Sequence, residues 1–279
     1  MNKEYIIYLN NGRKSENTIK VYTKYVQQML DYIGKDEKEI TWEDLMKWQS
    51  SLSNLSSSSV HLQTAAVKSY FNFLMRLGVI EKNPTAFLEA PKVKNKEKPF
   101  ITKQMVSDMV DACRTMRDKA IILTFCTTGM RVSELANITV EQYQCMGGDD
   151  GRELIITGKG DKQRTVYIND ETKQAIDMYL ATNPKGDSPW LFKSFQGNQI
   201  HANSLSQTIK STAKRAGIPF WNELSNHCMR AAFATIASDN GIPVPVISQA
   251  MGHTSINTTN VYIKRHQNQI NNAMKSMTF

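Results

Sequence analysis

The sequence has little that would mark a secreted, membrane-bound or metal-dependent protein. It holds four cysteines among 279 residues, and no two of them form a CxxC pair. Isolated cysteines are typical of reduced thiols in a cytosolic chain, and they lack the close spacing of zinc ligands. No run approaches the roughly 18 apolar residues of a membrane span, and the N-terminus lacks the apolar core of a signal peptide. We therefore expect a cytoplasmic protein that uses no metal and no other cofactor.

A nucleotide-binding loop is also missing. Gly158-Lys159-Gly160-Asp161 is too short for the GxxxxGK[ST] pattern that cradles phosphates. Charge is unbalanced, because 34 Lys and Arg against 26 Asp and Glu give a net charge of +8. Such a surplus favours a polyanionic partner such as nucleic acid, although on charge alone a merely soluble basic protein stays an alternative.

The chain divides at a lysine-rich stretch. Residues 91–99 place lysines between two prolines, which indicates a basic linker between domains 1–90 and 100–279. In the first domain, apolar residues recur at helical spacing after hydroxyl N-caps. Predicted helices there run from Ser15 to Gly34, onward from about Thr41, and from the Ser56–Ser59 run to Gly78.

The second domain contains the one predicted sheet. Apolar strands on either side of a glycine-rich tip indicate a β-hairpin within residues 153–168. Helical patterns cover residues 105–127, 170–180, 204–216, 229–239 and 244–251. The sequence therefore predicts a mainly α fold with a small β-sheet.

The reactive side chains of the second domain fit ordinary structural roles when each is taken alone. Lys159 suits a solvated hairpin tip, and His227 shares a helical face with Arg230 through i,i+3 spacing, as many surface pairs do. Their order along the chain is more specific. The residues in question are Arg131, Lys159, His227, Arg230, His253 and Tyr262.

These six residues stand in motifs that resemble the tyrosine recombinase (phage integrase) family. Arg131 lies in Thr-Gly-Met-Arg-Val-Ser-Glu-Leu, and Lys159 lies in Gly-Lys-Gly-Asp-Lys-Gln-Arg. Tyr262 ends the motif Met-Gly-His-Thr-Ser-Ile-Asn-Thr-Thr-Asn-Val-Tyr. Residues 55–84 are similar to part of the core-binding domain of Xer-type members. The resemblance implies a helical, SAM-like core-binding domain followed by an α+β catalytic domain.

The resemblance implies a site-specific DNA recombinase that works through a 3′-phosphotyrosine intermediate and a Holliday junction, with the six residues as its catalytic set. Tyr262 would be the nucleophile. Arg131 and Arg230 can fork onto the non-bridging oxygens of a phosphodiester and stabilise its transition state. Lys159 suits a general acid for the leaving 5′-oxygen, and the two histidines can orient the phosphate and exchange protons.

Two positions near the catalytic arginines bear on how those arginines are held. Ala231 stands where the family often carries a further histidine, which leaves the support of Arg230 open. Glu134 is interpreted as an acid that positions Arg131 rather than one that reacts.

DNA-binding residues are also implied by the resemblance. The helix over residues 58–77 would lie in a major groove, where His61, Gln63 and Lys68 would reach phosphates or base edges. Lys162 and Arg164 on the hairpin would contact phosphates. A solvated polar face is the alternative for each residue.

The implied partners are double-stranded DNA with inverted-repeat core sites and further copies of this chain, four protomers on two sites. Residues 263–279 resemble a C-terminal tail that docks into a neighbouring protomer, with packing on its own domain as the alternative. The apolar face of this tail consists of Ile270, Ala273, Met274 and Met277.

Two other classes remain as alternatives. A type IB topoisomerase would use the same chemistry as a monomer, but the compact first domain and the tail argue against it. A catalytically inactive DNA-binding regulator is disfavoured by the intact catalytic set. The target site stays open, as does the choice among a chromosome-dimer resolvase, a transposon resolvase and a phage or plasmid integrase.

Overall fold

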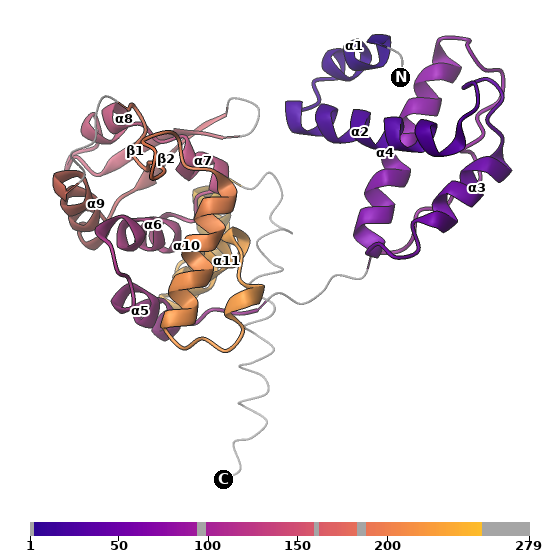
Figure 1. Cartoon of the computed structure of the whole chain (residues 1–279). Helices are drawn as coiled ribbons and strands as arrows, with labels where there is room; N and C mark the ends of the chain where they lie inside the picture. The colour runs from indigo at the N-terminus through magenta and orange to yellow at the C-terminus, as the bar shows by residue number, and fades with distance from the viewer. Residues whose placement is uncertain (1–2, 94–98, 159–161, 183–187, 253–279) are drawn as a thin grey trace. The chain divides into compact units, whose positions relative to one another are not determined.

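The chain forms two compact units, Met1–Lys96 and Glu97–Phe279, in a computed structural model that describes residues 3–93, 99–158, 162–182 and 188–252 (Figure 1). The change from one unit to the next falls within the lysine-rich residues 91–99. Among the described residues, no helix is long and apolar enough to cross a membrane.

The N-terminal unit is helical throughout its described elements. These are α1 (Lys3–Asn11), α2 (Glu16–Ile33), α3 (Trp42–Ser51) and α4 (Ser57–Arg76). Helices α2, α3 and α4 match the prediction, and each begins after a hydroxyl N-cap that accepts a backbone N–H three residues on. Helix α1 is not foreseen from the sequence. It is held by Tyr5 and Leu9, which are buried in the core of this unit.

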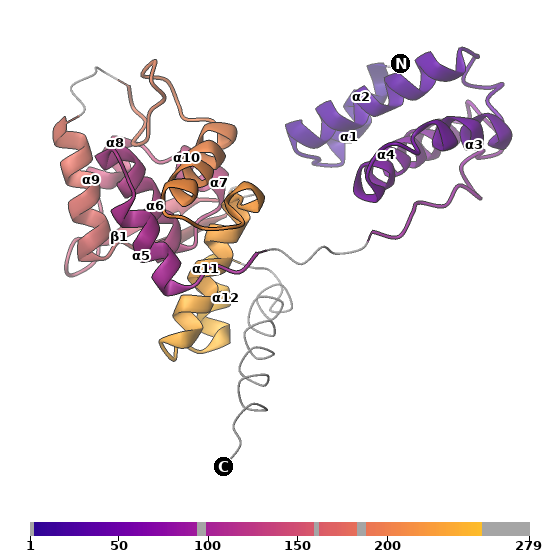
Figure 2. The same ribbon diagram turned by 60° about the horizontal axis from the view of Figure 1, so that its bottom comes forward.

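The C-terminal unit consists of helices packed around a central helix, together with a β-hairpin. Its elements are α5 (Lys103–Asp111), α6 (Met116–Thr128), α7 (Val132–Ala136), α8 (Val140–Gln144), β1 (Glu153–Thr157), β2 (Gln163–Tyr167), α9 (Asp170–Thr182), α10 (Ala202–Arg215), a 3₁₀ turn (Trp221–Glu223), α11 (Asn226–Asp239) and α12 (Val244–Met251). Helix α6 is at the centre, with α9 packed on one side and α10 and α11 on the other (Figure 1; Figure 2). The mainly α fold with a small β-sheet is confirmed.

The end of α6 determines where Arg131 and its motif lie. Helix α6 is buried nearly all round, as expected of a central helix. Gly129 ends it in the left-handed conformation, with φ of +60°. A Cβ built on Gly129 would lie 2.4 Å from the Phe233 ring, so the chain passes α11 at a distance that only glycine permits. Arg131, two residues after Gly129, is the N-cap of α7.

The hairpin has one buried face. Strands β1 and β2 pair antiparallel, with Leu154 opposite Val166 and Ile156 opposite Arg164. Leu154, Ile156 and Val166 are buried in the core of the C-terminal unit. Arg164 lies two residues before Val166 and therefore projects from the same, inward side.

Candidate active site

Arg131 is fixed by a carboxylate on its own short helix. Its backbone N–H donates to Glu134 Oε2 at 2.7 Å, and its Nη1 donates to Glu134 Oε1 at 2.9 Å. This side chain is still 34% exposed, so the contact orients the guanidinium without removing it from solvent. The expected position of Glu134 beside Arg131 is confirmed.

Glu134 is the centre of a cluster of cations. It is only 3% exposed. Arg164 donates to both carboxylate oxygens, from Nη1 to Oε1 at 2.6 Å and from Nη2 to Oε2 at 2.8 Å. Arg230 Nη1 lies 4.0 Å from Oε2. Burial by itself raises the pKa of a carboxyl group, but the hydrogen bonds from Arg164 and Arg131 outweigh it and lower the pKa of Glu134 to about 2.

Arg230 is buried in the first half of α11. Its Nη1 donates to the Gly129 carbonyl and its Nη2 to the Met251 carbonyl. Two backbone acceptors therefore hold this guanidinium where Ala231 offers no imidazole. His227 lies one turn earlier on the same helix and is exposed, which matches the i,i+3 relation read from the sequence.

Three arginines bind three successive carbonyls at the end of α12. Arg164 Nε donates to Ala250 O at 2.9 Å, Arg230 Nη2 to Met251 O, and Arg131 Nη2 to Gly252 O at 2.9 Å. The last carbonyls of a helix lack partners within the helix and carry partial negative charge, so they suit cationic donors. The three guanidiniums are thereby gathered at one place.

The predicted catalytic residues fall into two groups. Arg131 and Arg230 come together around Glu134, and His227 is on the helix that carries Arg230. Lys159, His253 and Tyr262 lie outside the described residues. Two of them follow directly on residues that lie beside the cluster. Gly252, whose carbonyl binds Arg131, precedes His253, and Gly158, where an added Cβ would lie 2.9 Å from Glu134 Oε1, precedes Lys159.

The predicted DNA-binding residues differ in exposure. Lys162 is exposed, Lys68 is half-buried, and His61 is exposed with its Nδ1 3.3 Å from Pro91 O. Gln63 is only 7% exposed, so it packs within the N-terminal unit. Arg164 uses all three guanidinium nitrogens on Glu134 and Ala250. In this arrangement Gln63 is buried and the Arg164 guanidinium is bonded to protein acceptors. The DNA contact expected of each residue stays a prediction.

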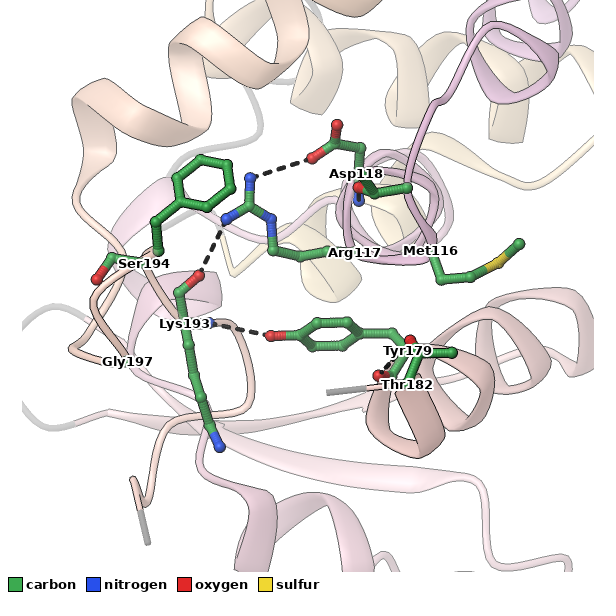
Figure 3. A pocket seen from close by; sticks show the side chains of 10 residues that line it. Met116, Arg117, Asp118, Tyr179, Thr182, Lys193, Ser194 and Gly197 are labelled. Carbon is green, nitrogen blue, oxygen red and sulfur yellow. Dashed lines mark hydrogen bonds and ion pairs between the residues drawn. The ribbon is translucent and has the colours of Figure 1, made fainter. Parts of the chain in front are cut away.

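A cavity of about 320 Å³ beside the start of α6 is separate from the cluster (Figure 3). Arg117 Nη1 donates there to Lys193 O at 3.3 Å, and its guanidinium lies 4.7 Å from the centre of the Phe195 ring. Tyr179 Oη accepts the Lys193 backbone N–H at 3.3 Å. These contacts hold the segment around Lys193 against α6 and α9, and none of the arginines around Glu134 lines this cavity.

Comparison with known proteins identifies the family of both units. The sequence matches the phage integrase family over residues 99–269 and the phage integrase N-terminal SAM-like domain over residues 3–78. Tyrosine recombinase XerA of Pyrococcus horikoshii is 29% identical over 267 residues, which cover 94% of this chain and 88% of that protein. A XerA recombinase crystal structure is 26% identical with a TM-score of 0.53, covering 92% of this chain and 90% of that one.

The fold extends to more distant proteins. A crystal structure of a lambda integrase fragment, a dimer bound to a COC′ core site, has a TM-score of 0.75 at 16% identity and covers 93% of this chain and 92% of that one. The chain belongs to the phage integrase family. Within that family it is a tyrosine-type, Xer-like site-specific DNA recombinase.

Proposed function

We propose that this recombinase cleaves DNA by attack of Tyr262 on a phosphodiester held by Arg131 and Arg230. The observation that carries the proposal is the convergence of the two guanidiniums on Glu134, at 2.9 Å for Arg131 and 4.0 Å for Arg230. The two arginines belong to α7 and α11, which are far apart in the sequence. Arg230 bonds the Gly129 carbonyl just before α7, and both arginines bond carbonyls at the end of α12.

The charge of the cluster suits an anionic ligand. Three arginines surround the single carboxylate of Glu134, which leaves a surplus of two positive charges among the described residues. The Arg131 side chain is 34% exposed and its guanidinium has five N–H donors in a fixed plane, so holding it by one edge is compatible with donation to a phosphate from another. Donors that are already oriented stabilise the charge that grows on the phosphate oxygens in the transition state.

The proposed step forms one ester bond and breaks another. Tyr262 Oη bonds to phosphorus while the bond from phosphorus to the 5′-oxygen breaks, which gives a 3′-phosphotyrosine and a free 5′-hydroxyl. Lys159 supplies the proton of that hydroxyl, and the phenol proton passes to a neighbouring base, the role we give to the histidines His227 and His253. Because the new ester keeps the bond energy, rejoining the strand needs no ATP.

DNA is held by both units in this proposal. Residues 1–90 form the core-binding domain and 91–99 a basic linker, with His61 and Lys68 on α4 facing the duplex. Lys162, exposed beside the hairpin tip, contacts a phosphate. The protein acts in the cytoplasm, on inverted-repeat core sites. Four protomers assemble on two sites through the segment 263–279, and strands are exchanged through a Holliday junction.

Covalent capture of DNA tests the proposal. The wild-type protein is incubated with a randomised pool of nicked duplexes, from which the short cleaved strand diffuses away and leaves the adduct trapped. We expect a denaturant-resistant protein–DNA adduct that enriches one sequence, and that Tyr262→Phe does not form.

The matched control is Tyr167→Phe, because Tyr167 is an exposed tyrosine of the same unit, hydrogen-bonded to Asp150 at 2.5 Å, on the face of β2 opposite to buried Val166. Adduct formation by Tyr262→Phe contradicts the assigned nucleophile. Cleavage of the pool with no enriched sequence, together with relaxation of supercoiled DNA, points instead to a topoisomerase.

A further inference from the structure

Arg164 is bonded at every guanidinium nitrogen and turned into the protein. Its side chain is 13% exposed, with Nη1 and Nη2 on the two oxygens of Glu134 and Nε on Ala250 O. The double contact with the carboxylate is the strong, geometrically specific form of an arginine–carboxylate pair. A phosphate would need the two Nη groups for the same double contact. In Arg164 these groups are already bonded to Glu134.

Through these contacts Arg164 joins the hairpin to two other segments. Glu134 belongs to α7 and holds Arg131 by its backbone and its side chain. Ala250 belongs to the last turn of α12, whose next two carbonyls bind Arg230 and Arg131. Arg164 thus contacts both the carboxylate and the helix end that orient the phosphate-binding pair.

Two glycines pack closely on the pair of Glu134 and Arg164. A Cβ built on Gly158 would lie 2.9 Å from Glu134 Oε1, and one built on Gly252 would lie 3.1 Å from Arg164 Cδ. Gly158 immediately precedes Lys159, and Gly252 immediately precedes His253. The two chain segments that lead to these catalytic residues therefore abut the same ion pair.

We propose that Arg164 is a positioning residue for DNA cleavage, which fixes Glu134 and the end of α12 and thereby orients Arg131, and that it does not bind a DNA phosphate. The proposal rests on the function proposed above, in which Arg131 holds the scissile phosphate. It replaces the phosphate contact that the sequence predicts for Arg164. Lys162 on the same hairpin keeps that role, since it is exposed.

The test separates the rate of cleavage from the affinity for DNA. Arg164→Lys and Arg164→Gln are compared with wild type on the duplex captured above, and the rate of adduct formation is measured at saturating DNA. We expect the saturated rate to fall by about 10²-fold, the usual consequence of misplacing a reacting group by about 1 Å. The half-saturating DNA concentration changes by less than about threefold, because no phosphate contact is lost.

Salt dependence identifies a phosphate contact independently of the rate. A residue that neutralises a phosphate lowers the slope of log affinity against log salt by about one when it is removed. We expect this change for Lys162→Gln and an unchanged slope for both Arg164 variants. Arg152→Lys is the matched arginine control, because Arg152 pairs with Asp170 at the base of the hairpin, away from Glu134. It should keep the wild-type rate and slope.

A double-mutant cycle tests whether Arg164 acts through Glu134. The effect of Arg164→Gln on the saturated rate should be several-fold smaller in a Glu134→Gln background, since coupled neighbours are not additive. All rates are measured at a temperature where circular dichroism shows each variant folded. A lowered salt slope with a normal saturated rate in the Arg164 variants overturns the proposal, and so does a wild-type rate in both. If the wild type itself forms no adduct, the proposed function fails instead.

Discussion

Replacing Glu134 with glutamine should destabilise the C-terminal unit by about 3 kcal/mol at neutral pH. The carboxyl group has its pKa lowered from 4.5 to about 2, and each pKa unit corresponds to about 1.4 kcal/mol of preference for the charged form. Glu134 is 3% exposed, so water screens little of this interaction. Removing one partner from a buried ion pair costs a similar amount, about 3–5 kcal/mol.

The sign of the pKa shift gives the loss a defined pH window. Because folding lowers the pKa, the charged carboxylate stabilises the folded state fully above about pH 4.5 and progressively less as the pH falls toward about 2. Glutamine has no such titration. Urea unfolding followed by circular dichroism should therefore show the full difference between wild type and Glu134→Gln at pH 7, and less than about half of it near pH 3.

An exposed glutamate provides the control for this measurement. Glu141 is exposed on α8, and Glu141→Gln should change the free energy of unfolding by less than about 0.5 kcal/mol. The reasoning is refuted by a loss at pH 7 no larger than that of Glu141→Gln. It is also refuted if the difference between Glu134→Gln and wild type is the same at pH 7 and near pH 3.

Three further predictions concern cleavage and assembly. Gly158→Ala should slow adduct formation by about tenfold or more, because its Cβ would lie 2.9 Å from Glu134 Oε1; a wild-type rate would show that the carboxylate can shift freely. Lys159→Ala should be defective on ordinary DNA and largely restored on a bridging 5′-phosphorothiolate, whose sulfur leaves without a proton; an equal defect on both substrates would leave Lys159 no role as the acid. Deleting residues 268–279 should preserve binding to one site but weaken cooperative occupancy of two in a gel-shift titration, whereas unchanged cooperativity with a lower melting temperature would mean that the tail packs on its own domain.

Local signals in the sequence were enough to place most helices. Ser15, Thr41 and Ser56 are side chains that accept backbone N–H groups at helix starts, and each one caps a helix in the structure. Helix α1 was missed because it is short and buries only Tyr5 and Leu9. Its stability comes from packing on the rest of the N-terminal unit, and no local pattern reports that packing.

Contacts between distant segments were only partly predictable. That Arg131 and Arg230 belong to one site was inferred from the family resemblance, since nothing local in the sequence joins α7 to α11. The backbone carbonyls that hold Arg230 have no signal in the sequence, because every residue carries one.

The orientations of Arg164 and Gln63 could have been predicted. Arg164 lies two residues before buried Val166 on a strand, and Gln63 lies four residues before buried Val67 on a helix. Both spacings put the polar side chain on the buried face. Family resemblance suggested DNA contacts for these residues, and strand or helix periodicity argued for the interior.

The row of carbonyls at the end of α12 makes the site depend on helix register more than on side-chain identity. Substitutions at exposed positions of this helix, such as Val246 and Gln249, leave the carbonyls of residues 250–252 where they are. Inserting or deleting one residue within α12 would instead rotate the row by about 100° around the helix axis. Arg131, Arg164 and Arg230 would then lose their acceptors together. Point mutations at the exposed positions of α12 should therefore be tolerated, whereas a single-residue change in its length should inactivate the enzyme.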